Sequence, residues 1–369
     1  MIFRIIIITI ILLLSAPPVF SQAKVGSIGG LFLELSPDVR ANGMGHTGVA
    51  LTDSRAGFFN PAATAMINSD KRFKLSLGYL DMPAEIDVSH LTLTAKILKP
   101  KNFSGRGFHL GVGFYTVNLN LGDLIETTYQ QGTDAGTGRI FHVDEISYNF
   151  SLGAGFSTFI DLSAGVTFKY FKEEYADEEA EGTAVDFGFQ FSKDLGPCFF
   201  KRYINDKSRW LLRPSLGLAF TNFGPDLEIA KNEYPLPKKW GPGLALEIAR
   251  EKIYNTGSWR QFSIIAAVEI EDYLSSSDYR KSLTKAGIEA GLFDAVYLRV
   301  GNGGYQNVDF NWGFSFNSQG IAYLLGAANA TTGSFGHFFR EKIRIAFHYA
   351  LDDMTDLPDN IHYGLTVSF

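Results

Sequence analysis

The residues of this chain that could do chemistry do not form the patterns of a catalytic or metal site. The seven His residues never adopt a metal-ligand spacing such as H-E-x-x-H, and His90, His348 and His362 stand singly in apolar stretches. No G-x-S-x-G sequence provides the nucleophile elbow of a hydrolase. The glycine-rich stretches Gly26–Gly30 and Gly301–Gly304 lack the Lys and Ser/Thr of a phosphate loop. These patterns predict a protein that is not an enzyme and holds no cofactor or metal.

Polar residues instead occupy every second position of apolar stretches. The net charge is only -6, and no basic cluster indicates a nucleic-acid partner. The acidic run Glu173–Glu181 lacks the spacing and Gly of an EF-hand, so we expect a solvated loop there. If the apolar positions face lipid, the interleaved residues line a polar lumen of mixed charge, in which opposite charges can pair. This set is Asp161, Thr167, Lys169, Asp186, Gln190, Arg213, Ser215, Lys285, Glu289, Asp309, Asn311, Arg344 and His348.

The period of two indicates β-strands, and its repetition favours a membrane barrel over a soluble sandwich. The last stretch places Tyr363, Leu365, Val367 and Phe369 on one face and ends on an aromatic residue. The barrel assembly machinery recognises such a C-terminal aromatic strand, so we expect these residues to direct assembly. About ten residues per strand match a tilted crossing of the bilayer, where lipid contacts the apolar face.

Fifteen stretches qualify as strands, but an even number is expected for a bacterial barrel. The Gly- and Ala-rich stretch Ile321–Ala327 is the weakest, and removing it gives fourteen strands; one missed strand would give sixteen. We expect long external loops at Leu119–Gly138, Glu173–Gly182, Asn222–Lys238 and Ala328–Glu341, and short periplasmic turns. The fourteen preferred strands are 73–80, 86–98, 106–118, 139–156, 160–171, 183–193, 210–221, 239–250, 261–271, 282–292, 295–301, 308–317, 342–350 and 361–369.

The chain divides into three parts. Residues 1–23 resemble a secretory signal peptide, with Arg4 before the apolar run Ile5–Leu14. Residues 24–72 alternate poorly and are rich in Gly, Ala and Asn, whereas 73–369 form the expected barrel. No other segment approaches the roughly 20 apolar residues of a membrane helix, and the single Cys198 excludes an internal disulfide. We therefore expect export and insertion into the outer membrane of a Gram-negative cell.

The sequence Asp38–Asp53, followed by Gly57–Ala63, resembles the N-terminal signature of the PorV/PorQ family in the FadL-like superfamily of outer-membrane barrels. This signature combines a stretch similar to R-A-x-G-M-G with an N-P-A, here Arg40, Gly43, Met44, Gly45, Asn60 and Pro61. Leu216–Pro225 and Pro235–Pro237 are similar to a later strand and turn of that family. The resemblance implies a barrel with an N-terminal hatch in its lumen. Gly43 and Gly45 would allow close approach to the wall, and Arg40 can pair with a lumenal carboxylate.

Two functions follow from the resemblance and the polar lumen. The first is a component or partner of the type IX secretion system, in which external loops bind a translocon or a surface-attachment complex. The second is a FadL-like transporter of hydrophobic small molecules, which would need an apolar pocket. The hatch residues either brace the barrel or gate it. We prefer the secretion component, because the predicted lumen is polar.

Overall fold

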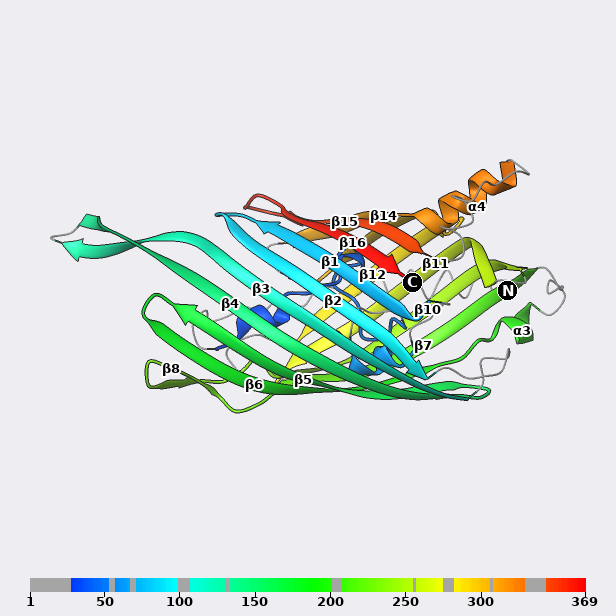
Figure 1. Ribbon diagram of the computed structural model, residues 1–369, viewed down its shortest axis with the longest axis horizontal. Helices are drawn as coiled ribbons and strands as arrows, with labels where there is room; N and C mark the ends of the chain where they lie inside the picture. The colour runs from blue at the N-terminus through cyan, green and yellow to red at the C-terminus, as the bar shows by residue number, and fades with distance from the viewer. Residues whose placement is uncertain are drawn as a thin grey trace.

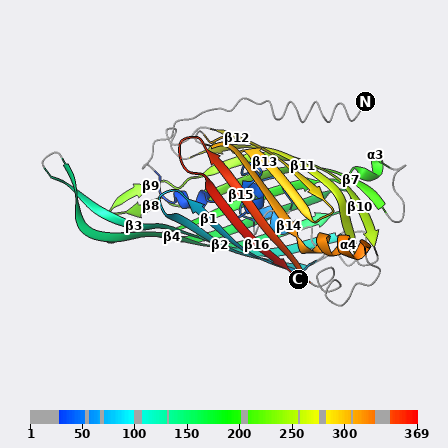
Figure 2. The ribbon, with the colours of Figure 1, turned by 90° about the horizontal axis from the view of Figure 1, so that it is seen from above.

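The chain folds into a closed antiparallel β-barrel of fourteen strands, seen in a computed structural model (Figures 1 and 2). The structure describes residues 28–52, 57–66, 71–98, 107–130, 133–200, 208–254, 257–274, 282–305, 308–328 and 343–369. The expected signal peptide, residues 1–23, lies outside them. The predicted fold class and strand number are confirmed.

Each of the fourteen preferred stretches forms a strand of the wall, and two short strands form a separate hairpin. The wall contains β1 (Phe73–Met82), β2 (Ile86–Leu98), β3 (Gly107–Gln130), β4 (Thr133–Ser157), β5 (Asp161–Tyr175), β6 (Glu178–Ser192), β7 (Ser208–Phe223), β10 (Lys239–Tyr254), β11 (Gly257–Tyr273), β12 (Leu283–Leu292), β13 (Val296–Asn302), β14 (Val308–Asn317), β15 (Arg344–Met354) and β16 (Asn360–Ser368). The separate hairpin is β8 (Leu227–Ile229) with β9 (Asn232–Tyr234). The helices are η1 (Leu31–Glu34), α2 (Val39–Asn42), η2 (Pro61–Thr64), α3 (Gly196–Phe199) and α4 (Ser318–Ala328).

The first and last strands close the barrel. β1 pairs with β16 from Lys74 opposite Ser368 to Asp81 opposite Ile361. At the start of β1, Phe73 and Phe369 exchange two backbone hydrogen bonds of 2.9 and 3.0 Å, and their rings stack at 5.6 Å. We call this end of the barrel the C-terminal end. The opposite end, where β3 and β4 extend beyond the other strands, is the hairpin end (Figure 1).

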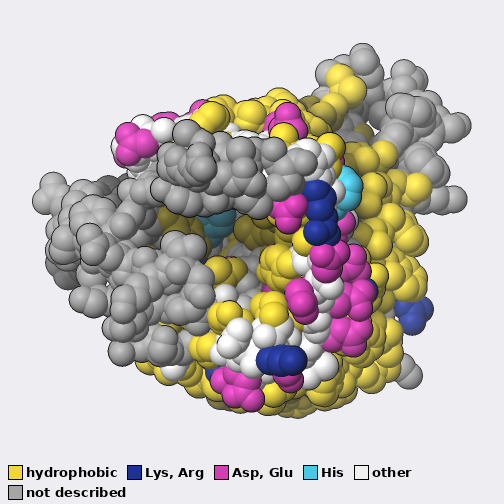
Figure 3. Space-filling view, turned by 90° about the vertical axis from the view of Figure 1, so that its left-hand side faces the viewer, with side chains coloured by type: hydrophobic (Ala, Val, Ile, Leu, Met, Phe, Trp, Pro, Cys, Tyr) yellow, Lys and Arg dark blue, Asp and Glu magenta, His cyan; other side chains and the backbone are white. Residues whose placement is uncertain are grey.

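The outside of the wall is apolar and the inside is polar, as the alternation predicts. In β16, Tyr363 and Leu365 are exposed, whereas His362 and Thr366 are buried. Large exposed apolar side chains recur on the other strands in the same way, and Figure 3 shows them on the outside of the wall, with acidic side chains at the rim of the hairpin end. Soluble proteins rarely expose such a continuous apolar surface. The wall therefore spans a membrane.

The preferred strand count is right because Ile321–Ala327 belongs to α4, an 11-residue helix without a charged residue. This helix continues from β14 at the C-terminal end, where β14 pairs Asn317 with Ala346 of β15. The connection that contains Ala328–Glu341 therefore starts at the C-terminal end, opposite to the end that carries Leu119–Gly138, so the two segments are not external loops on the same side, as the sequence predicts; residues 329–342 lie outside the described ranges. No helix among the described residues is long and apolar enough to cross a membrane.

The other expected loops also differ from the structure. Most of Leu119–Gly138 continues β3 and β4 as a two-stranded projection, because these two strands keep pairing beyond the ends of the other strands. Glu173–Gly182 is almost entirely strand, with a tight turn between Tyr175 and Glu178. Asn222–Lys238 contains the β8–β9 hairpin. Backbone pairing thus replaces irregular loop in all three segments.

Candidate functional site

The described part of residues 28–66 lies inside the barrel, and we call it the N-terminal segment. Its short helix α2 contacts β14, β15 and β16, whereas its helix η2 contacts β3, β4, β5 and β6. These two sets of strands are far apart in the strand order around the barrel. The segment therefore crosses the lumen from one side of the wall to the other.

A row of glycines makes room for η2. Gly111, Gly153, Gly165 and Gly188 stand directly opposite one another on β3, β4, β5 and β6. A methyl group at Gly165 would lie 2.4 Å from the carbonyl carbon of Pro61, and one at Gly188 would lie 2.0 Å from Asn60 Oδ1. We call these four residues the glycine belt. A side chain at these positions would occupy the space that the N-terminal segment fills.

Asn60 makes hydrogen bonds within the N-terminal segment and also between this segment and the wall. Its side chain accepts a hydrogen bond of 3.0 Å from the Ala62 amide and so caps η2, where Pro61 occupies the first turn. Its Nδ2 donates to the carbonyl oxygens of Val49 at 2.8 Å and of Phe189 in β6 at 3.0 Å. Asn60 is fully buried. The predicted N-P-A motif thus caps a helix at the point where the segment meets β6.

Gly43, Met44 and Gly45 pack against the opposite part of the wall. Met44 is fully buried, and a methyl group at Gly287 of β12 would lie 2.1 Å from its carbonyl oxygen. Gly45 has a φ of +68°, and its Cβ would lie 2.5 Å from the amide nitrogen of Asn302. Glycine is required here both for the left-handed backbone and for the close approach.

Arg40 extends from α2 to the wall carboxylate Glu289 of β12. Its Nε and Nη2 each donate a hydrogen bond of 2.8 Å to the two carboxylate oxygens. Arg299 of β13 donates to the same carboxylate at 2.6 Å and to Ser315 Oγ at 2.6 Å. Ser315 is hydrogen-bonded to His348 Nδ1 at 2.6 Å. The expected pairing of Arg40 with a lumenal carboxylate is therefore present in the structure.

Three further anchors of the N-terminal segment were not predicted from the sequence. Glu269 of β11 accepts hydrogen bonds from the backbone amides of Gly48 and Val49, at 2.9 and 3.0 Å. Glu173 of β5 accepts one from the Gly30 amide at 2.8 Å. The inward positions of both glutamates on alternating strands are the signal that could have identified them. Their partners, however, are backbone amides, and a backbone amide leaves no pattern in the sequence.

The third of these anchors is a pair of histidines on one carboxylate. Asp352 of β15 lies 3.3 Å from His46 Nε2 of the segment and 3.0 Å from His362 Nε2 of β16. The other ring nitrogen of His362 lies 3.1 Å from Asn42 Nδ2. His46 also packs edge-on against Tyr305, with ring centroids 5.5 Å apart. His46, within the stretch Asp38–Asp53, therefore has a partner in the wall.

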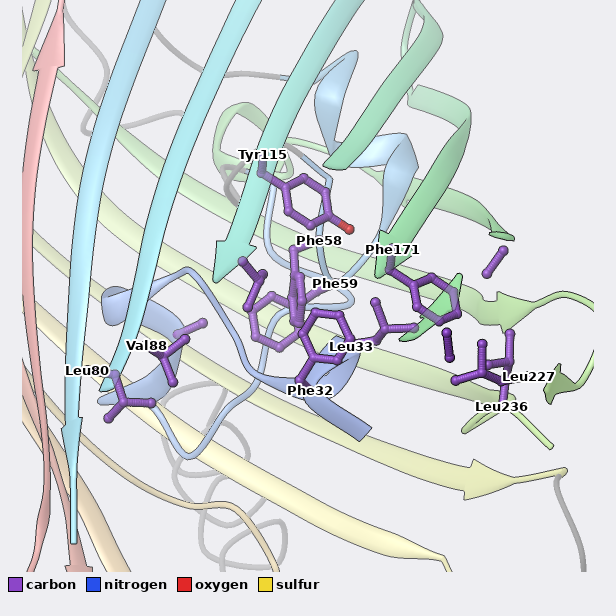
Figure 4. Packing of buried hydrophobic residues seen from close by; sticks show 14 residues of the cluster. Phe32, Leu33, Phe58, Phe59, Leu80, Val88, Tyr115, Phe171, Leu227 and Leu236 are labelled. Carbon is purple, nitrogen blue, oxygen red and sulfur yellow. The ribbon is translucent and has the colours of Figure 1, made fainter. Parts of the chain in front are cut away.

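The N-terminal segment leaves a cavity of about 320 Å³ in the half of the lumen towards the C-terminal end. Towards the hairpin end, a much smaller cavity of about 40 Å³ remains. There the segment and the wall form an apolar cluster that includes Phe32, Phe58 and Phe59 of the segment (Figure 4). Near the hairpin end the lumen therefore combines this apolar cluster with charged residues such as Lys169, Lys239 and Glu271, which line the small cavity, whereas the larger cavity towards the C-terminal end is mainly polar.

The residues expected to direct assembly lie away from this site. Tyr363, Leu365 and Phe369 are exposed on the outside of the wall, and Val367 is half-buried there. No group of His, Cys, Asp and Glu side chains within the described ranges is arranged to hold a metal ion. Cys198 is exposed.

The sequence matches no protein-family model and no curated protein. Solved structures of membrane barrels are similar in fold at low identity. The toluene transporter TodX of Pseudomonas putida is 10% identical over 95% of this chain and 99% of that chain, with a TM-score of 0.42. A FadL homologue of Pseudomonas aeruginosa is 10% identical over 90% and 98%, with a TM-score of 0.43. The transport unit of the autotransporter AIDA-I from Escherichia coli is 8% identical over 82% and 91%, with a TM-score of 0.41. These likenesses concern the barrel fold alone.

Proposed function

We propose that the protein is an outer-membrane channel for small hydrophobic molecules and that the N-terminal segment is its gate. The observation that carries this proposal is the apolar cluster towards the hairpin end (Figure 4). Phe58 packs on Tyr115 of β3 with ring centroids 5.7 Å apart, and Phe32 packs on Phe171 of β5 at 6.2 Å. When these side chains withdraw, the wall presents an apolar surface on which a hydrophobic molecule can replace them.

The polar anchors favour a gate over a permanent plug. Glu289 keeps Arg299 at 2.6 Å when Arg40 leaves, and Glu269 keeps Lys285 at 3.7 Å when the Gly48 and Val49 amides leave. Withdrawal of the segment therefore leaves neither carboxylate without a basic partner, and an unpaired buried charge is the costliest outcome of such a movement. These second partners in the wall lower the electrostatic cost of the proposed open state.

A reversible disulfide tests the gate. Cβ atoms at Gly43 of the segment and at Ala350 of β15 lie 3.4 Å apart, close to the 3.5–4.5 Å typical of a disulfide. The double variant Gly43→Cys/Ala350→Cys, made in a Cys198→Ser background, should lock the segment when oxidised. Uptake of the fluorescent apolar probe N-phenyl-1-naphthylamine by intact cells should fall to the level of cells without the barrel and recover with reductant. Equal uptake in both states, with cross-linking verified on a gel, would refute the gate.

One observation favours a second function, the predicted secretion component. The β3–β4 projection beyond the hairpin end carries a cross-strand pair, Ile125 and Ile140, which are 62% and 56% exposed. Exposed isoleucines on a projecting ribbon are suited to contact with a protein partner, and this supports the second proposal. The PorV/PorQ assignment and the type IX secretion role remain predictions that rest on the sequence motif.

A further inference from the structure

A cavity inside the barrel lies between the N-terminal segment and the C-terminal end. Its volume of about 320 Å³ is within the range of small-molecule sites, about 300–1,000 Å³. Arg40, Leu51 and Thr52 of the segment line it, together with inward-facing residues of the wall. Arg209 belongs to the lining, and its side chain is 42% exposed, so the cavity extends to the solvent at the C-terminal end.

Basic residues outnumber acidic ones in this cavity. Seven of the described lining residues are Arg or Lys and four are Asp or Glu. Both Arg40 and Arg299 bind the one carboxylate of Glu289. Because the acids are fewer than the bases and are shared among them, the described part of the lining carries an excess of positive charge.

The remaining acids already have donors. Glu251 lies 2.9 Å from Arg209 and 3.4 Å from Arg260. Asp294 accepts hydrogen bonds of 2.7 Å from the Arg260 amide and from the Tyr297 hydroxyl. These carboxylates therefore leave the positive charge of the cavity only partly compensated.

Arg213 of β7 has hydrogen-bond donors that no acceptor binds. Its Nη1 lies 3.6 Å from Glu247 Oε2, and Arg260 Nη2 lies 2.8 Å from Oε1 of the same carboxylate. Its Nε and Nη1 are buried without a hydrogen-bond partner. Buried polar atoms in proteins are nearly always satisfied, so two unsatisfied donors on one guanidinium beside a cavity indicate a missing acceptor. The planar fork of Arg matches the two oxygens of a carboxylate or a phosphate.

We propose that this cavity binds the carboxylate or phosphate group of a small water-soluble molecule, with Arg213 as its principal donor. Ser215 lies two residues further along the same face of β7 and lines the same cavity, where its hydroxyl adds a second donor type. The inference builds on the proposed channel, because the cavity lies on the path between the apolar cluster and the C-terminal end.

Isothermal titration calorimetry of the purified full-length barrel at low ionic strength tests this site. The probes are succinate, inorganic phosphate and the short-chain lipid dihexanoylphosphatidic acid, each alone. Wild type should bind succinate or phosphate, and Arg213→Gln should weaken that binding at least tenfold. Arg139→Gln removes an exposed Arg of β4 that pairs with Asp177, far from the cavity, and should leave the affinity unchanged. Binding of the lipid alone, or of no probe, overturns the proposal.

Two controls separate misfolding and transport from binding. Arg213→Lys keeps the charge but loses the planar fork, so it should bind more weakly than wild type and more tightly than Arg213→Gln; heat-modifiable migration on a gel verifies that each variant is folded. The oxidised Gly43→Cys/Ala350→Cys barrel should still bind, because the cavity opens at the C-terminal end. If the barrel binds succinate or phosphate but the disulfide does not change uptake of the apolar probe, only the proposed channel is refuted. If the disulfide controls uptake but neither anion binds, only the proposed anion site is refuted.

Discussion

Arg40 of the N-terminal segment and Glu289 of the wall, 249 residues apart in the sequence, are joined by two hydrogen bonds of 2.8 Å. The geometry is the bidentate one that suits a guanidinium and a carboxylate. Both side chains are largely buried, with 16% and 3% of their surfaces exposed. This pair is therefore a buried, bidentate ionic link between the proposed gate and the barrel.

We expect Arg40→Ala to loosen the gate. Hydrogen bonds to charged groups contribute about 1.5–3 kcal/mol, so the open fraction should rise roughly tenfold or more. Uptake of N-phenyl-1-naphthylamine by intact cells should increase accordingly. Arg139→Ala is the matched control, since Arg139 also binds a carboxylate with short contacts but is half exposed, where such pairs contribute little. Equal uptake by wild type and Arg40→Ala would show that this pair does not hold the gate.

The glycine belt gives a second prediction. In Gly188→Ala the new methyl group would lie 2.0 Å from Asn60 Oδ1, so η2 must leave its position. The barrel itself should still assemble. Limited proteolysis should cut the N-terminal segment of Gly188→Ala much faster than that of wild type. Gly78→Ala adds a methyl group on the inner face of β1 with no atom closer than 3.4 Å, and its segment should stay protected. Equal protection in all three proteins would contradict the packing described here.

The alternation predicted the wall because each strand meets lipid on one side and polar groups on the other. His362 and Tyr363 show the difference, one buried inside and one exposed outside. The same rule fails where lipid ends. Beyond the rim, β3 and β4 contain Asp123, Glu126 and His142, and polar residues on both faces remove the periodicity although the strands continue to pair.

The candidate site was only partly predictable, because it depends on register. The motif identified Arg40 and Asn60, but Glu289 and Phe189 became their partners only when distant strands were brought around the lumen. The members of the glycine belt are scattered through four strands, and only pairing places them in one row. Amphipathic spacing reveals which face a residue takes, and not which residue lies opposite.

The β3–β4 projection tests the secretion hypothesis. In Ile125→Ser/Ile140→Ser both exposed isoleucines become polar while the strand pairing stays, so the projection should keep its shape and lose its apolar contact. If the barrel is a secretion component, a large protein should co-purify with wild type from solubilised outer membrane and be absent from the double variant. Uptake of the apolar probe should be the same in both. A partner retained by the double variant would exclude this surface as the contact.

Phe369 closes the barrel and ends its chain, and two variants separate these roles. Deleting it removes the ring that stacks on Phe73 and the backbone hydrogen bonds to Phe73 and Arg72, whereas Phe369→Ala removes only the ring. If the assembly machinery recognises the terminal aromatic side chain, both variants should reduce heat-modifiable barrel in the outer membrane several-fold, and Phe369→Trp should restore it. Impairment by the deletion alone would assign the effect to backbone closure instead, and normal levels of all variants would refute any role of this residue in assembly.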